Sequence, residues 1–201
     1  MKRAVTRELY RYWDALRGSR PAPDCADLHP NAMRSCLADA FVLDCDPGYP
    51  FRLAGTSVCA LFGHELKGIA FSALWAGASG PAMEHLLQCM FAETIGAVVS
   101  VTGRNAIGET LDIEMVVLPL LPGKGAKARL VGALSPVALP YWIDARPLVT
   151  LHGGDPRYLG AAHDCGNARR LVSGRSNPLR GRGFVIYPAV GTGALPRRHQ
   201  G

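Results

Sequence analysis

The sequence lacks several patterns that would assign a chain to a large functional class. It has no run of about 18 apolar residues, the length that a membrane-spanning helix needs, and its longest strongly apolar run is Met115–Leu121. The first eight residues contain no apolar run of the kind that a secretory signal requires. None of the six cysteines forms a Cys-x-x-Cys pair. We therefore expect a cytoplasmic protein with reduced thiols.

Motifs that carry catalysis or bind metals are also missing. No Gly-x-Ser-x-Gly, phosphate-loop or His-Glu-x-x-His sequence is present, and the segment 123–125 is better explained as a turn between strands. Cys59 with His64, and His163 with Cys165, lack the four-ligand spacing of a structural zinc site. We therefore predict that the chain is not an enzyme, has no catalytic residues and binds no metal.

Haem and flavin are poorly supported as cofactors. His64 follows Gly63 in a predicted turn, and His85 lies off the apolar stripe of its helix. Neither histidine is therefore expected to face an apolar cavity, as an axial haem ligand must. Cys59 lies on a predicted short helix, but its neighbours form no motif that would support a flavin-reactive thiol. We predict no cofactor.

The formal net charge of +6 is unevenly distributed along the chain. From Leu151 onward there are eight arginines and only two aspartates, so the first 150 residues are close to neutral. The segment 153–201 has little apolar surface to offset its ordering entropy, and we predict a mostly disordered basic tail. Such a tail could bind nucleic acid. A nucleic-acid-associated protein is therefore the alternative function, although a solvated tail without a partner is favoured.

Hydrophobic periodicity predicts a helix, a β-hairpin, a helical middle and three further strands. The predicted helices cover 5–17, 31–36, 56–63, 71–75 and 81–96, and the strands 39–46, 51–55, 97–103, 111–118 and 127–134. A further strand at 147–151 is left open. This order favours an α+β fold with a five-stranded antiparallel sheet and helices on one face. The expected organisation is an N-terminal helix (1–20), a domain (21–152) and the basic tail (153–201).

Several short motifs resemble those of PAS domains, in particular stand-alone bacterial PAS-like proteins with an N-terminal Leu-Tyr-x-Tyr-Trp helix. They are Leu9-Tyr10-Arg11-Tyr12-Trp13, Leu16-Arg17-Gly18, Phe51-Arg52-Leu53-Ala54-Gly55-Thr56, Leu61-Phe62-Gly63, Leu66-Lys67-Gly68 and Glu114–Leu120. The resemblance spans roughly 9–134. It implies a PAS-like five-stranded sheet, helices over one face, a small-molecule pocket or dimer surface, and a general signalling role.

Two sets of apolar residues are candidate sites. Side chains enclosed between a sheet and its helices can line a concave apolar pocket, and methionine adapts to irregular ligands. The candidate residues for a small apolar ligand are Phe62, Trp75, Met83, Leu87, Met90, Met115 and Val117, with an ordinary packed core as the alternative. The stripe Leu9, Tyr12, Trp13 and Leu16 on the N-terminal helix packs either on its own domain or on a partner.

Three charged residues of the predicted strands have less specific interpretations. Asp112 and Glu114 alternate with apolar residues, and solvent exposure explains both. Arg52, between Phe51 and Leu53, is expected to face away from both and either supports the structure or meets an acidic group of a ligand. Together these observations predict a PAS-like sensory or regulatory module that acts through a homodimer or an unidentified signalling protein, with a small ligand as an option.

Overall fold

The computed structural model describes residues 1–123 and 127–159 of the chain. Its elements, with η marking a 3-10 helix, are α1 (Ala4–Arg17), η1 (Cys25–Asp27), η2 (Pro30–Met33), η3 (Leu37–Asp39), β1 (Ala40–Asp44), β2 (Phe51–Ala54), α2 (Thr56–Phe62), η4 (Phe71–Leu74), α3 (Ser79–Ala92), β3 (Gly96–Asn105), β4 (Thr110–Leu120), β5 (Arg129–Pro136) and β6 (Leu148–Leu159). Every predicted helix and strand has a counterpart whose bounds differ by a few residues.

Helix α1 has the predicted amphipathic pattern. Thr6, Leu9 and Trp13 are buried, whereas Arg7 and Arg11 on other sides of the helix are exposed. Buried positions at intervals of three and four residues form a single stripe along a helix, and this stripe faces the sheet.

The sheet is antiparallel, and among the described residues it has six strands in the order β2-β1-β5-β4-β3-β6. The α+β prediction is confirmed, but the expected count of five strands is corrected. Strand β6 pairs with β3 as far as Leu159, so residues 153–159 belong to the sheet and not to a tail. The sequence pattern does not indicate a strand here because it contains Gly153, Gly154 and Pro156. Proline is nevertheless tolerated in β6, because β6 is an edge strand. Residues 160–201 lie outside the described residues.

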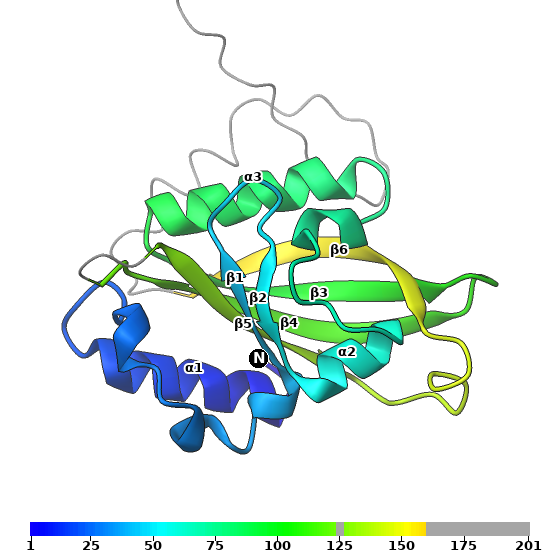
Figure 1. Cartoon of the computed structure of the whole chain (residues 1–201), viewed down its shortest axis with the longest axis horizontal. Helices are drawn as coiled ribbons and strands as arrows, with labels where there is room; N and C mark the ends of the chain where they lie inside the picture. Colours follow the sequence, from blue (N-terminus) through cyan, green and yellow to red (C-terminus); the bar gives the residue numbers. More distant parts are fainter. Residues whose placement is uncertain (124–126, 160–201) are drawn as a thin grey trace, which may run out of the picture.

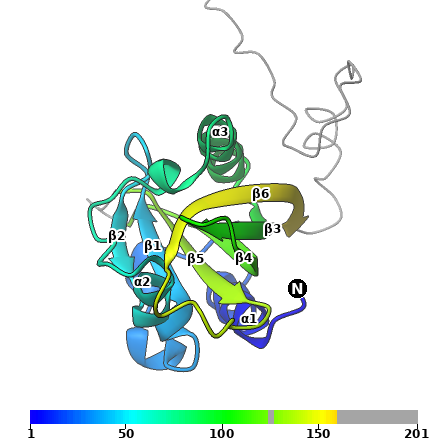
Figure 2. The ribbon, with the colours of Figure 1, turned by 90° about the vertical axis from the view of Figure 1, so that its right-hand side faces the viewer.

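The two faces of the sheet carry separate apolar layers. Figures 1 and 2 show α3 and α1 on opposite sides of the sheet. Side chains of successive strand residues alternate between the faces: Phe41 and Leu43 of β1 belong to the cluster beneath α2, η4 and α3, and Ala40 belongs to the cluster beneath α1. We call these the inner layer and the outer layer. The predicted arrangement, helices on one face plus an N-terminal helix, is confirmed.

Strand β4 runs through Pro119 to Leu120, which corrects the expected end of this strand at residue 118. Strand β3 begins at Gly96, and its pairing with β4 begins where Ala97 lies opposite Val117. Beyond Val117, β4 therefore has a strand neighbour only on the β5 side. The Pro119 carbonyl accepts a hydrogen bond of 2.8 Å from Trp13 Nε1. In an antiparallel strand, the backbone N and O of one residue point to the same side. The Pro119 nitrogen therefore points to the side on which β4 has no strand neighbour, where no hydrogen bond between strands is required.

Candidate functional site

The seven predicted ligand-site residues all lie in the inner layer. Phe62 comes from α2, Trp75 follows η4, three residues come from α3 and two from β4. They are buried, with exposed fractions from 0% to 5%: Phe62, Trp75, Met83, Leu87, Met90, Met115 and Val117. The structure therefore brings together every residue of this set. That they bind a ligand stays a prediction.

Four aromatic rings pack together in the inner layer, and three of them were not among the residues that the sequence predicted for the site. Phe71 lies at the centre of the group, with ring centroids 5.6 Å from those of Phe41, Phe51 and Trp75. The Phe51 and Trp75 rings meet Phe71 edge to face, a favourable geometry for aromatic pairs. Strand alternation places Phe41 and Phe51 on the inner face, which is the signal that could have identified them.

Trp75 carries an unusual polar group in this apolar layer. Its indole Nε1–H is buried and has no hydrogen-bond partner among the described residues. The backbone holds the residue in place: Trp75 bridges to Leu151 of β6, and the N–H of Ala76 donates to the Leu151 carbonyl at 3.0 Å. A buried donor without a partner costs about 1–3 kcal/mol. The site therefore presents one unused donor to any molecule that enters the layer.

Two titratable side chains of the inner layer, Cys45 and Tyr49, are uncharged at physiological pH. Burial, with smaller effects from neighbouring acidic groups, raises the pKa of Cys45 to about 11 and that of Tyr49 to about 12. Cys45 packs against the inner cluster and Tyr49 belongs to it. An uncharged surrounding of this kind suits an apolar molecule better than an ion.

Histidine and cysteine residues considered for haem or flavin lie outside the inner cluster or at its edge. His64 and His85 are both exposed. The Cys59 thiol lies 3.6 Å from a carboxylate oxygen of Glu65, and burial raises its pKa, with Glu65 also raising it. In residues 1–123 and 127–159, no three His, Cys, Asp or Glu side chains are grouped so that they could hold a metal ion. His163 and Cys165 lie outside the described residues.

The apolar stripe of α1 packs largely on its own sheet. Leu9 is 0% exposed and Trp13 is 3% exposed, both in the outer layer. Tyr12 is half-buried and packs against this layer, and Leu16 is half-buried. Of the two alternatives that the sequence left open, packing on its own domain is the one that the structure shows for Leu9 and Trp13. These two side chains are not available to a partner while α1 stays on the sheet.

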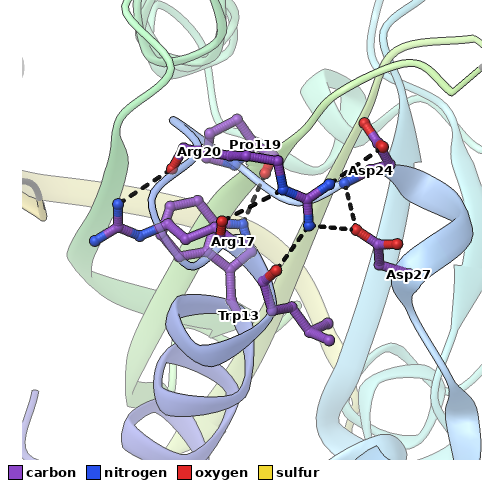
Figure 3. Close-up of polar contacts among 7 residues, drawn as sticks. Trp13, Arg17, Arg20, Asp24, Asp27 and Pro119 are labelled. Atoms are coloured by element: carbon purple, nitrogen blue, oxygen red, sulfur yellow. Dashed lines mark hydrogen bonds and ion pairs between the residues drawn. The ribbon is translucent and has the colours of Figure 1, made fainter.

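Polar contacts fix the C-terminal end of α1 (Figure 3). Trp13 reaches the Pro119 carbonyl, and the Arg17 guanidinium lies 5.4 Å from the centroid of the Trp13 ring. The Arg20 side chain donates to Asp27 at 2.7 Å, to Asp24 at 3.2 Å and to the Leu16 carbonyl at 2.7 Å. The guanidinium fork thus joins the end of the helix to the segment that follows it.

Glu114 fixes the other end of α1, which corrects the expectation that solvent exposure explains this residue. It is 7% exposed, and its carboxylate accepts hydrogen bonds from the N–H groups of Lys2 and Arg3 and from the Thr6 hydroxyl. Burial alone would raise the pKa of Glu114, but these hydrogen bonds outweigh it and hold the pKa below its ordinary value. Asp112 is exposed, as expected.

The strand order and the two helical layers can now be compared with known families. A family model described as a PAS domain matches residues 1–135, about two thirds of the chain. The chain belongs to the PAS domain family. PAS domains are in general sensory modules, so membership supports a sensory role, and a catalytic role is not typical of the family.

Solved structures that resemble this PAS chain include several light-oxygen-voltage (LOV) proteins. The Rhodobacter sphaeroides LOV protein matches with a TM-score of 0.41 and 15% identity, over 51% of this chain and 60% of its own, so less than two thirds of its length is spanned. The light-state Aureochrome1 LOV domain matches with a TM-score of 0.41 and 19% identity, over 54% and 88%. A LOV domain studied with a flavin analogue matches with a TM-score of 0.44 and 16% identity, over 54% and 83%.

Other comparisons add little to the family assignment. No curated protein matches the sequence significantly. None of the helices in the part of the chain that the structure describes combines the length and apolar character needed to cross a membrane. The nucleic-acid alternative depends on the basic segment, most of which lies outside the described residues, and the PAS assignment does not favour it.

Proposed function

We propose that this PAS domain is a sensory module that binds a small, largely apolar molecule with one hydrogen-bond acceptor in its inner layer. The observation that supports this most strongly is the unpartnered Nε1–H of Trp75. In a packed core that binds nothing, the extra apolar surface of the indole would have to offset the cost of the unpaired donor, which phenylalanine would not carry. A ligand carbonyl or ether oxygen would satisfy the group.

The surroundings of Trp75 favour such a ligand. Met83 and Met90 of α3 and Met115 of β4 are fully buried in the same cluster. Methionine side chains are unbranched and can change rotamer to accommodate a guest. The neutral Tyr49 and Cys45 add no charge. A neutral molecule is therefore expected in preference to an anion.

The output of the module is proposed to be a contact with another protein or with a second copy of the chain. A ligand changes such a contact only by its differential affinity for the two conformations of the domain. Since Leu9 and Trp13 are covered by their own sheet, a partner would meet other apolar side chains. Leu139 and Tyr141, between β5 and β6, are 71% and 91% exposed and supply apolar surface of this kind.

Native mass spectrometry of the purified full chain tests the ligand. The wild-type chain is expected to retain a noncovalent small molecule, and Trp75→Phe to lose most of it. The matched control is Trp142→Phe, which shortens another buried tryptophan of the same cluster and should retain the molecule. Equal retention by Trp75→Phe, or no retained mass in the wild type, would contradict the proposal. The same spectra report whether the chain is a homodimer.

A further inference from the structure

A cleft on the outer side of the sheet is separate from the inner layer. It has a volume of about 410 Å³, within the range of small-molecule sites. Its apolar lining includes Val42 of β1, Leu53 of β2 and Leu120 of β4. Cys25 and Leu28 line it from the segment that follows α1. Helix α1 covers the neighbouring part of this face but does not contribute to the lining.

A bulge between β1 and β2 shapes the cleft. The strand register shifts between Val42, which pairs with Leu53, and Leu43, which pairs with Phe51. Arg52 is therefore the extra residue, and a bulge of this kind redirects side chains. Arg52 and Leu53 both line the cleft, which corrects the expectation that they face opposite ways. Both are exposed, Leu53 with a fraction of 45%.

The charged groups of the cleft are all cationic. Arg52, Lys67 and Arg129 line it, and no carboxylate does. Asp44, beside the cleft, binds Arg129 at 3.0 Å and lies 4.0 Å from Arg52 at the limit of an ion pair. No carboxylate forms an ion pair with Lys67 within the described residues. Asp44 is thus close to Arg129 and Arg52 but forms no ion pair with Lys67, and Arg52 and Lys67 keep donors free for an anion.

We propose that this outer cleft binds a small organic carboxylate that carries an apolar chain. Arg52 and Lys67 donate to the carboxylate, since a guanidinium fork matches its two oxygens. The chain lies over Val42, Leu53 and Leu120. A neutral apolar molecule would leave the cations unused, and a small inorganic anion would leave the apolar floor exposed, so the combination selects an amphipathic anion.

Submicellar decanoate is the probe, and binding is measured calorimetrically on the full chain. Arg52→Gln with Lys67→Gln should weaken decanoate binding by about ten-fold or more. The matched control Arg104→Gln removes an exposed cation of β3, away from the cleft, and should leave binding unchanged. Decan-1-ol, which lacks the charge, should bind about ten-fold more weakly than decanoate. Trp75→Phe should not affect decanoate, so failure here is distinguishable from failure of the inner-layer proposal.

Alkylation of the half-buried cysteines gives a second readout that does not depend on a variant. Decanoate should slow modification of Cys25, which lines the cleft, but not of Cys89, which lies on α3 across the sheet. Equal rates at Cys25 with and without decanoate would overturn the proposal, as would equal binding of acid and alcohol. A dimer that Leu53→Asp dissociates, with no decanoate bound in either form, would assign the cleft to a second copy instead.

Discussion

Replacing Glu114 with glutamine removes a negative charge from the junction between α1 and the sheet. The carboxylate accepts hydrogen bonds from three groups, the Lys2 N–H, the Arg3 N–H and the Thr6 hydroxyl. Hydrogen bonds to a charged partner contribute about 1.5–3 kcal/mol, against about 0.5–1.5 kcal/mol for neutral ones. Neutralising the acceptor therefore costs about 1 kcal/mol per donor. Because the Lys2 and Arg3 donors are only part-buried, we expect Glu114→Gln to lower the free energy of unfolding by about 2 kcal/mol in total.

Urea unfolding followed by tryptophan fluorescence measures this loss, and its pH dependence identifies the cause. The native pKa of Glu114 is lowered, so the carboxylate stabilises the fold above the pKa of an unfolded glutamate, about 4.3, and the stabilisation disappears as the pH falls through the native pKa. The gap between wild type and Glu114→Gln should therefore shrink in acid.

The control for this prediction is Asp112→Asn, which changes an exposed carboxylate two residues away on the same strand. We expect it to alter stability by less than about 0.5 kcal/mol. A Glu114→Gln variant as stable as this control, or a gap that stays constant from neutral to acid pH, would refute the reasoning.

Three further predictions concern packing and reactivity. Trp13→Phe should lower the free energy of unfolding, measured in urea, by about 2–3 kcal/mol, because it leaves the Pro119 carbonyl without its hydrogen-bond donor and removes buried apolar surface. Gly132→Ala should cost about 1–3 kcal/mol or prevent folding, because its new Cβ would lie 2.3 Å from the Phe41 ring. Cys45, with a pKa of about 11, should react with iodoacetamide at pH 8 about 100-fold more slowly than an ordinary thiol, as followed by mass spectrometry.

Each of these has its own control. Tyr10→Phe changes a half-buried ring stacked on Trp13 and should cost far less than Trp13→Phe. Gly123→Ala adds a Cβ with no neighbour within 4 Å and should be nearly neutral. Cys45 should react at an ordinary rate in the unfolded chain, and a fast reaction in the folded chain would contradict its burial.

The helices and central strands could be predicted because their signals are local. Helix α1 shows its buried stripe directly in the spacing of Leu9 and Trp13. The end of α2 is marked by Gly63, which adopts a left-handed φ of 71° that favours glycine. Strand β6 was largely missed because an edge strand buries fewer side chains, so Gly153 and Pro156 break its pattern without preventing pairing.

Features that depend on contacts between distant segments could not be read from the sequence. Glu114 alternates with apolar residues like any exposed strand residue, and only the arrival of Lys2 and Arg3 from the N-terminus buries it. The bulge that turns Arg52 and Leu53 to one side is a matter of register, which local patterning does not specify here. The inner-layer candidates could be grouped from the sequence because the apolar periodicity of a helix and of a strand each marks the buried face of that element. That the Nε1–H of Trp75 has no hydrogen-bond partner among the described residues could be recognised only from the packed structure.

The indole proton resonance of Trp75 tests the central claim most directly. The chain has three tryptophans, so their Nε1–H signals can be assigned by single substitutions in a ¹⁵N–¹H spectrum. Natively purified protein should be compared with protein that has been unfolded, freed of small molecules and refolded. We predict that removing small molecules changes the chemical shift of the Trp75 Nε1–H from that of a hydrogen-bonded proton to that of a proton without a partner. The chemical shift of the Trp13 Nε1–H, which is hydrogen-bonded to the Pro119 carbonyl, should not change. Identical Trp75 resonances in both samples would contradict a ligand in the inner layer.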